Sequence, residues 1–344
     1  MKIDLKGLNA HEMEEWAVGL GLEIYRGRQV RNWLMKRLAR SFNEMSDLPK
    51  SLRTLLNEKA DITHLEKFKT LVSKDSTKKY LFKLTDGLFI ESVLIPERDH
   101  FTLCISSQAG CAMGCRFCLT AKQGLKRNLK SSEIIDQVIQ VKRSMDTPDR
   151  LTNIVLMGMG EPLANYDAVL KTIRNLISDD GMNFSHRKVA LSTCGLIPQM
   201  KQLGKDITVN LAISLNAADN ETRSFLMPIN RKYPLESLIS ACRDFPLPKR
   251  RMITFEYILI KGINDSDEDA LKLASLLSGI RSKINLIPLN QFPGSDLSPP
   301  SLENTLHFQE TLINNHFTAI IRKSKGKDIM AACGQLSGAW AENL

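Results

Sequence analysis

The chain has 344 residues, 43% hydrophobic and 25% charged, which are the proportions of a globular protein and exclude a wholly disordered one. Lys and Arg number 47 against 38 Asp and Glu, so the net charge is +9 and a polyanionic partner such as RNA, DNA or a membrane surface is favoured. No apolar run approaches the ~18 residues that a membrane span needs. The first residues carry charges where a signal peptide has its apolar core, so we expect a cytoplasmic protein.

The first 66 residues have a helical pattern and are expected to form a small N-terminal domain. Val30, Trp33, Leu34 and Leu38 fall on one stripe of a helix, at the spacing that buries one face. A second helix is predicted to begin near Pro49.

Residues 67–100 change to the period of a β-strand. Two apolar runs, 79–84 and 88–95, flank the turn dipeptide Asp86-Gly87, and Pro96 ends the second run. This is a strong hairpin signal, so we expect a β-hairpin extension here.

From residue 101 to 325, short apolar runs alternate with helical patterns. The alternation predicts a parallel sheet buried on both faces, and about six βα units favour a full or partial barrel over an open sheet. Residues 326–344 are expected to form a C-terminal loop and tail. The predicted strands are 103–106, 154–157, 189–192, 209–214, 254–259, 284–288 and 318–322.

The cysteines carry the chemistry. There are seven, an odd number that argues against a secreted disulfide framework, and four of them fall between positions 104 and 118. Cys111, Cys115 and Cys118 form a C-x3-C-x2-C run. Three thiolates on one loop can hold three irons of a [4Fe–4S] cluster and leave the fourth iron open. The alternative is a zinc site with Cys104 as fourth ligand, but structural zinc usually pairs two knuckles and the chain has no second one.

This cysteine run, with Phe117 before its last member, resembles the radical S-adenosylmethionine (SAM) enzymes. Further stretches resemble one branch, the RlmN/Cfr adenine methyltransferases, over residues 20–337. These stretches are 106–111, 123–129, 157–162, 211–217, 284–288 and 331–335. The resemblance implies a partial (βα)6 barrel with a helical N-terminal RNA-binding domain, one [4Fe–4S] cluster per chain and two SAM molecules per turnover.

The resemblance also implies the residues that contact SAM. Each lies at or just after a predicted strand end, where α/β folds place their ligands. Such residues can otherwise serve as turn or helix caps. The family usually has His where this chain has Asn216, and Asn cannot titrate near neutral pH. The implied contacts are Gly160, Glu161, Ser192, Ser214, Leu215, Asn216 and Asn290.

Two further cysteines match the family's catalytic pair. Cys333 lies among glycines, and the nearby basic residues 322–327 are expected to favour its thiolate. The resemblance implies that Cys333 takes a methyl group from one SAM, and that a radical from a second SAM activates this methyl for addition to adenine. Cys104 then releases the RNA through a transient disulfide with Cys333. A lone cysteine in a strand is otherwise a small buried hydrophobe, and Cys194 and Cys242 keep that interpretation.

Glu91 is the candidate proton acceptor. Strand alternation puts it on the face of Phe89, Val93 and Ile95, so we expect its carboxylate to be partly desolvated, as suits a base. The competing interpretation is an edge carboxylate paired with a lysine.

The expected partners are 23S rRNA, tRNA and an electron donor such as flavodoxin or ferredoxin, with the protein a monomer. Basic residues (Lys122, Lys126, Arg127, Lys130) follow the cysteine run, and phosphate contacts of this kind bind RNA without sequence choice. We favour methylation of adenine carbon 2. The motifs also fit carbon 8, and a non-catalytic iron–sulfur RNA-binding protein is the alternative from another class.

Overall fold

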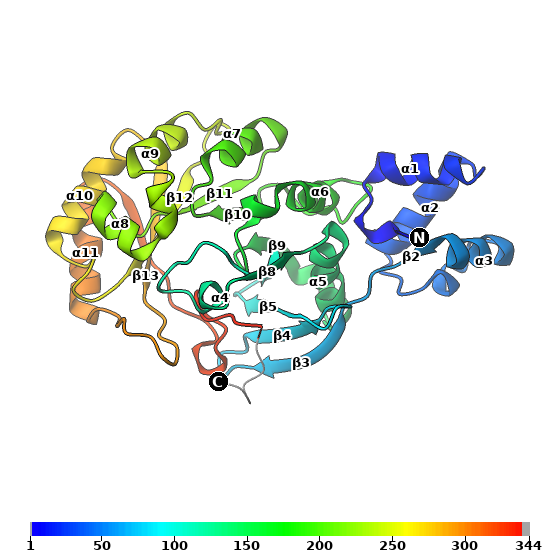
Figure 1. Cartoon of the computed structure of the whole chain (residues 1–344), viewed down its shortest axis with the longest axis horizontal. Coiled ribbons are helices and arrows are strands. Elements are labelled where there is room, and N and C mark those ends of the chain that lie inside the picture. Colours follow the sequence, from blue (N-terminus) through cyan, green and yellow to red (C-terminus); the bar gives the residue numbers. More distant parts are fainter. Residues whose placement is uncertain (1, 339–344) are drawn as a thin grey trace.

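The computed structural model describes residues 2–338. Its largest element is a sheet of ten strands in the order β14-β13-β12-β11-β10-β9-β6-β5-β4-β3 (Figure 1). These strands are β3 (Glu66–Val72), β4 (Lys78–Lys83), β5 (Phe89–Pro96), β6 (Phe101–Cys104), β9 (Leu151–Leu156), β10 (Val189–Thr193), β11 (Asn210–Ser214), β12 (Ile253–Leu259), β13 (Ser282–Pro288) and β14 (Thr318–Ile321).

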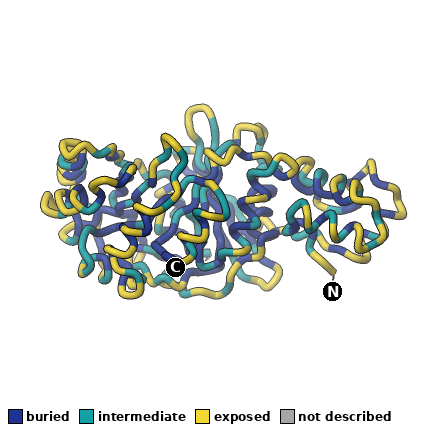
Figure 2. Tube along the Cα trace, turned by 90° about the horizontal axis from the view of Figure 1, so that it is seen from above, coloured by how far each residue is buried: buried dark blue, intermediate teal, exposed yellow. Residues whose placement is uncertain are grey.

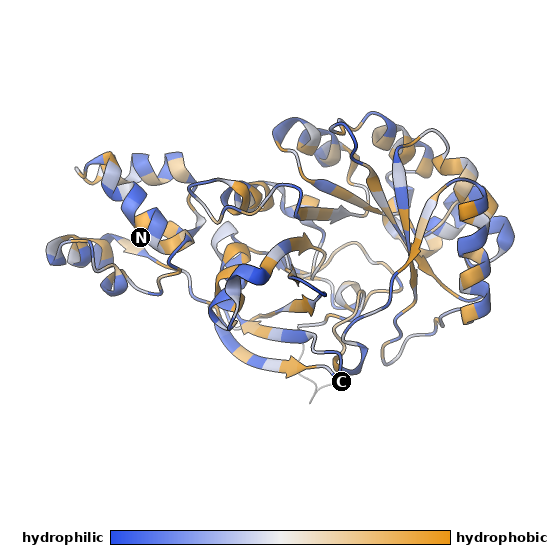
Figure 3. Ribbon diagram, turned by 180° about the vertical axis from the view of Figure 1, so that it is seen from behind, coloured by the Kyte–Doolittle hydropathy of each residue, from blue (hydrophilic) through white to orange (hydrophobic). Residues whose placement is uncertain are grey.

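From β6 to β14 all neighbouring strands are parallel, and helices connect them. The predicted partial (βα)6 barrel is therefore confirmed, with β14 as a last strand that does not close it. The parallel strands are mostly apolar (Figure 3). Buried residues alternate with partly buried ones along β9, β10, β12 and β13, and β14 has exposed residues. The connecting helices are α5 (Ser131–Arg143), α6 (Tyr166–Ile177), α7 (Ile197–Asp206), α8 (Asn220–Leu226), α9 (Leu235–Arg243), α10 (Asp267–Leu277) and α11 (Leu302–Asn314).

The predicted hairpin is present as β4 and β5, which pair antiparallel. Gly87 has a φ of 85°, a left-handed conformation that glycine adopts without strain, and this explains the Asp-Gly signal. The hairpin belongs to a larger antiparallel extension, because β3 pairs with β4 and β5 pairs with β6.

The N-terminal region contains α1 (Ala10–Gly19), α2 (Ile24–Met35) and α3 (Lys50–Lys59), with β1 (Ile3–Asp4) paired to β2 (Ala60–Asp61). The helix predicted near Pro49 is confirmed. The predicted stripe is correct for Val30, Trp33 and Leu34. It is wrong for Leu38, which lies beyond the end of α2 with a φ of 57°.

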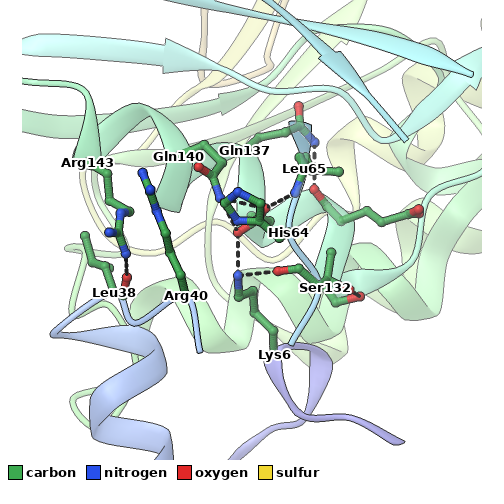
Figure 4. A network of polar contacts seen from close by, with 12 residues as sticks. Lys6, Leu38, Arg40, His64, Leu65, Ser132, Gln137, Gln140 and Arg143 are labelled. Carbon is green, nitrogen blue, oxygen red and sulfur yellow. Dashed lines mark hydrogen bonds and ion pairs between the residues drawn. The ribbon is translucent and has the colours of Figure 1, made fainter. Parts of the chain in front are cut away.

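Buried polar contacts attach this N-terminal region to the barrel, from which it projects at one end of the molecule (Figure 2). The Lys6 ammonium lies 2.6 Å from the Asp136 carboxylate on α5, and both side chains are excluded from water. Lys6, His64 and Gln140 converge there (Figure 4), and the Leu65 amide donates to Asp136. Because an unpaired buried charge is costly, this network resists separation of the two parts.

No helix within residues 2–338 is long and apolar enough to cross a membrane.

Candidate active site

A cavity of about 170 Å³ lies at the carboxyl ends of the parallel strands. This is the end at which α/β folds bind ligands. Most of the predicted site residues line it, namely Cys111, Cys115, Cys118, Gly160, Glu161, Ser192, Ser214, Asn216 and Cys333. The other predicted residues, Glu91, Cys104, Leu215 and Asn290, are not among the residues that line it.

The three clustered cysteines sit on a loop between two short strands that sequence reasoning missed, β7 (Gln108–Gly110) and β8 (Leu125–Asn128). Gly110 has a φ of 79°, and a Cβ there would lie 1.9 Å from the Gly124 carbonyl oxygen. Only glycine therefore allows the chain to enter this loop. Cys118 precedes the short helix α4 (Leu119–Lys122), and its amide donates to the Cys115 carbonyl.

The three thiols of the cysteine run line the same cavity. Burial raises the pKa of each one, that of Cys111 to about 11. Three cysteine sulfurs around a common space are what an iron–sulfur cluster with three protein ligands requires.

Gly160 and Glu161 follow β9. Both carboxylate oxygens of Glu161 accept backbone N–H groups, Oε1 from Leu163 and Oε2 from Cys194, at 3.0 and 2.8 Å. Burial nevertheless raises the pKa of this carboxyl. Gly160 has a φ of 99° and a Cβ there would meet Gln108 at 2.5 Å, so the backbone passes close to β7.

The ends of β10 and β11 bring Ser192 and Ser214 together, with their hydroxyl oxygens 3.4 Å apart. Both face the cavity. Leu215 is fully buried, and its backbone is held by Glu256 and Arg223. Both backbone polar groups of Leu215 therefore have protein partners, and the residue does not line the cavity.

Asn216, which stands where the family has His, has a φ of 61° and a buried side chain. Its Oδ1 accepts the Ile258 amide at 2.8 Å, and its Nδ2 lies 3.1 Å from the Met227 sulfur. Asn is among the residues that tolerate the left-handed region. The side chain thus fixes the turn after β11, a role that requires no titration.

The loop that carries Cys333 is bonded on two sides. On one side, Asn290 donates to the Cys333 carbonyl at 3.2 Å, and the Leu119 amide donates to Gly334. The Asn290 Oδ1 atom is buried and has no hydrogen-bond partner within residues 2–338. A buried acceptor of this kind is a place where a bound cofactor can donate, which agrees with the predicted role of Asn290.

On the other side, the loop is bonded to the turn between β3 and β4. The Asp75 carboxylate accepts the Gly326 amide, and Asp328 accepts from Ser73 and Lys74. The loop therefore spans from the end of the parallel sheet to the hairpin extension.

Cys333 faces the open cavity, and its side chain is exposed there. Surrounding protein still desolvates the thiol, and together with the negative charge of Glu256 this raises its pKa to about 11. The positive charge of Arg322 offsets only part of this increase in the Cys333 pKa. The expectation that the nearby basic residues favour the Cys333 thiolate is thus wrong, because burial and Glu256 outweigh the effect of Arg322 on the pKa.

Cys104 ends β6 and is buried between Val93 and Val155 on the adjacent strands. Burial raises the pKa of its thiol, and the charge of Cys333 raises it further. The structure therefore brings the two predicted partners within electrostatic range of each other, although 228 residues follow Cys104 before Cys333.

Glu91 lies on β5 and is almost fully buried, in the interior of the sheet and not at its edge. Its carboxylate lies 3.0 Å from the Lys79 ammonium and accepts the amides of Ser337 and Gly338 at 2.8 and 3.1 Å. Lys79 also donates to the Met330 carbonyl. Glu91 and Lys79 thus bind the Cys333 loop to the hairpin extension. The predicted desolvation of Glu91 is present, and so is the lysine partner of the competing interpretation.

Among the predicted basic residues, Arg127 is not free to bind phosphate. Its guanidinium pairs with Glu133 at 2.7 Å and with Asp86. Lys122 lies over the Phe292 ring and donates to the Gly294 carbonyl.

Among the carboxylates that line the cavity, one was missed in the sequence analysis. Glu256, on β12, lines the same cavity as Cys333. The available signal was a single carboxylate inside an otherwise apolar buried strand.

Comparison with family models finds two matches. The radical SAM superfamily matches residues 105–274, and a ribosomal RNA large subunit methyltransferase N-terminal domain matches residues 3–62.

Curated relatives match along nearly the whole chain. A dual-specificity RNA methyltransferase RlmN of Syntrophus aciditrophicus (strain SB) is 52% identical over 98% of this chain and 97% of its own. The enzyme of the same name from Geobacter sulfurreducens is 54% identical over 98% of this chain and 92% of its own.

Among solved structures, a radical SAM methyltransferase from Sphaerobacter thermophilus superposes with a TM-score of 0.94 at 42% identity. The match covers 98% of this chain and 100% of that one, so the N-terminal helices and the barrel have the same arrangement in both.

Proposed function

The chain belongs to the RlmN family of radical SAM methyltransferases, and from this we propose that it methylates carbon 2 of adenine in 23S rRNA and in tRNA. The rRNA target is in the peptidyl-transferase region and the tRNA target lies beside the anticodon. One observation carries the proposal: three cysteines of the cluster spacing and Cys333 line a single cavity.

In this proposal Cys111, Cys115 and Cys118 hold a [4Fe–4S] cluster. Gly160, Glu161, Ser192, Ser214, Leu215, Asn216 and Asn290 surround SAM. When bound, SAM would supply the methyl group, and the cluster together with a second SAM would supply the radical that activates it. The orphaned Asn290 acceptor and the paired hydroxyls of Ser192 and Ser214 support this placement of SAM.

Cys333 accepts the methyl group and carries it to the RNA. Carbon 2 of adenine is an electron-poor ring carbon and cannot displace a methyl group from SAM, whereas a thiolate can. The exposed Cys333 side chain, on a loop fixed at both ends, suits a carrier that meets the cofactor and the RNA in turn.

Release of the methylated RNA requires a second thiol and a proton acceptor. The Cys104 thiolate attacks the Cys333 sulfur, the bond from that sulfur to the transferred carbon breaks and its electron pair goes to that carbon of the RNA product, which leaves a transient Cys104–Cys333 disulfide. The electrostatic effect of Cys333 on Cys104 supports this pairing. Glu91 is the proposed acceptor of the proton from the adenine ring. Its buried carboxylate contacts the end of the Cys333 loop.

We further propose that the protein acts as a monomer, that flavodoxin or ferredoxin supplies its electrons, and that it works in the cytoplasm on its RNAs. The target adenine must leave its stack to reach the cavity, so loops are better targets than duplexes.

The test uses anaerobically reconstituted protein with SAM, a reductant, and unmodified 23S rRNA and tRNA. Digested nucleosides are compared by mass spectrometry with 2-methyladenosine and 8-methyladenosine. We expect 2-methyladenosine in both RNAs. If 8-methyladenosine is the only product, the protein methylates carbon 8 instead. If no methyladenosine forms although the cluster is intact, the protein is a non-catalytic RNA-binding protein.

A further inference from the structure

We propose that Glu256 accepts the proton of the Cys333 thiol when this cysteine takes up its methyl group. The inference rests on the proposed function, because it assumes that Cys333 is the methyl carrier. A thiol must lose its proton to act as a nucleophile. None of the residues assigned above removes that proton.

Glu256 faces the cavity because of its position on β12. Thr254, Glu256 and Ile258 alternate with Phe255 and Tyr257, which are fully buried on the opposite face of the strand. Tyr257 contacts Phe308 of α11 there. The inner face carries Glu256 and Ile258 into the cavity wall, where Cys333 also lies.

The Glu256 carboxylate has a free oxygen. Oε1 accepts the Asn285 amide at 2.9 Å, and Oε2 has no hydrogen-bond partner within residues 2–338. The other two glutamates already have partners. Both carboxylate oxygens of Glu161 accept backbone amides. The Glu91 carboxylate accepts a backbone amide and forms an ion pair with Lys79. Glu161 and Glu256 both line the cavity, and of these two Glu256 is the one with an oxygen available to accept a proton from Cys333.

Charges around the pair agree with this assignment. Burial raises the pKa of Glu256, which brings its basicity closer to that of a thiolate, while Arg322 and Lys283 partly lower it. In turn, the Glu256 charge is one of the causes that raise the pKa of Cys333. The carboxylate and the thiol line the same cavity, and the charge of Glu256 acts on the thiol across it.

The step balances. The Cys333 S–H bond breaks and the proton goes to Oε2 of Glu256, leaving the electron pair on sulfur. That pair forms the bond to the methyl carbon of SAM. The bond from that carbon to the sulfonium breaks, and its pair stays on the sulfur of S-adenosylhomocysteine.

The first measurement follows methyl transfer to Cys333. Reconstituted holoenzyme receives SAM with a deuterated methyl group, without RNA or reductant, and mass spectrometry of the Cys333 peptide gives the rate per unmethylated chain. Glu256→Gln is expected to slow this transfer by about 100-fold at pH 7, as general-base loss does. Glu256→Asp restores part of the rate, and Glu268→Gln, the same change on the exposed face of α10, leaves it unchanged.

The second measurement needs no cofactor turnover. The rate of Cys333 alkylation by iodoacetamide is recorded against pH, with the labelled peptide identified. Removing the neighbouring negative charge in Glu256→Gln is expected to move the midpoint to lower pH, so this variant alkylates faster while it methylates more slowly. A loss of packing alone does not produce these opposite changes.

Transfer at the wild-type rate in Glu256→Gln, or an unmoved alkylation midpoint, overturns the inference. If the wild-type protein places no deuterated methyl group on Cys333, the proposed function itself fails. The two failures are therefore distinguishable.

Discussion

The two proposed reacting thiols differ in their access to the cavity. Cys333 is exposed to it, whereas Cys104 is 8% exposed and held between two valines. Cys333 can therefore react with the RNA directly. Cys104 can react only when the modified Cys333 sulfur comes into contact with it. The order of the two roles follows from this difference.

Substitution of each cysteine separates these roles. Cys104→Ala is expected to leave RNA covalently attached to Cys333, because no thiol releases it. Cys333→Ala should form neither product nor adduct. Denaturing gels of reactions with labelled RNA measure the adduct, and Cys242→Ala, a buried thiol away from the cavity, is the control. Free product from Cys104→Ala would contradict the disulfide step.

Glu91 has a chemical and an anchoring role that can be separated. Glu91→Gln keeps an oxygen for the Ser337 amide but loses the proton acceptor, so SAM cleavage should continue while methyladenosine formation falls at least tenfold. Lys79→Met removes the ammonium and keeps the carboxylate. The measurement is the amount of 5′-deoxyadenosine and of methyladenosine that each variant forms. Unchanged methyladenosine formation in Glu91→Gln would show that Glu91 is not the proton acceptor.

Among secondary-structure elements, the parallel strands could be predicted because burial on both faces makes them continuous apolar runs. The pair β7 and β8 could not, since Gln108–Gly110 and Leu125–Asn128 are short and polar. The partnership of Lys79 with Glu91 was also hidden. It depends on strand register, in which Lys79 lies opposite Val93 and Glu91 opposite Leu81, so the two are diagonal neighbours.

The loop carrying Cys333 depends on carboxylates that titrate in acid. Burial alone raises the pKa of Asp75, but hydrogen bonds from Thr77 and Gly326 lower it to about 2, below its ordinary 3.8. The stabilisation is therefore complete above pH 3.8 and is lost as the pH falls toward 2. Asp75→Asn should imitate this loss at neutral pH.

The measurement for Asp75→Asn is hydrogen exchange of residues 326–338. Exchange should rise several-fold there and stay unchanged in α10, which has no contact with the anchor. Asp86→Asn, at the neighbouring β4–β5 turn, is the matched control. Equal protection in the variant and the wild type would show that Asp75 does not hold the loop.

Across the whole molecule, buried charge fixes the N-terminal helices to the barrel. Lys6 and Asp136 are 130 positions apart in the chain, so no local pattern could reveal their pairing. The N-terminal helices thus have a fixed orientation relative to the cavity. An RNA that contacts both the N-terminal helices and the cavity must therefore fit this fixed arrangement.

Asp136→Asn tests this attachment. Removing one partner of a buried pair leaves an uncompensated charge, and the free energy of unfolding should fall by about 3–5 kcal/mol. Denaturant unfolding measures it. Asp61→Asn, which alters the exposed pair with Lys2, should change stability by less than about 0.5 kcal/mol. Similar losses in both variants would argue against a buried tether.

The placement of the Cys333 loop near the end of the chain also guides how the protein should be produced. Glu91 holds the amides of Ser337 and Gly338, whereas Lys2 lies in the N-terminal region that projects away from the barrel (Figure 1). An affinity tag or fluorescent fusion added before Lys2 leaves the reacting thiol undisturbed. A fusion at the other end of the chain is attached closer in sequence to the two amides that Glu91 holds, so the activities of the two fusions should be compared.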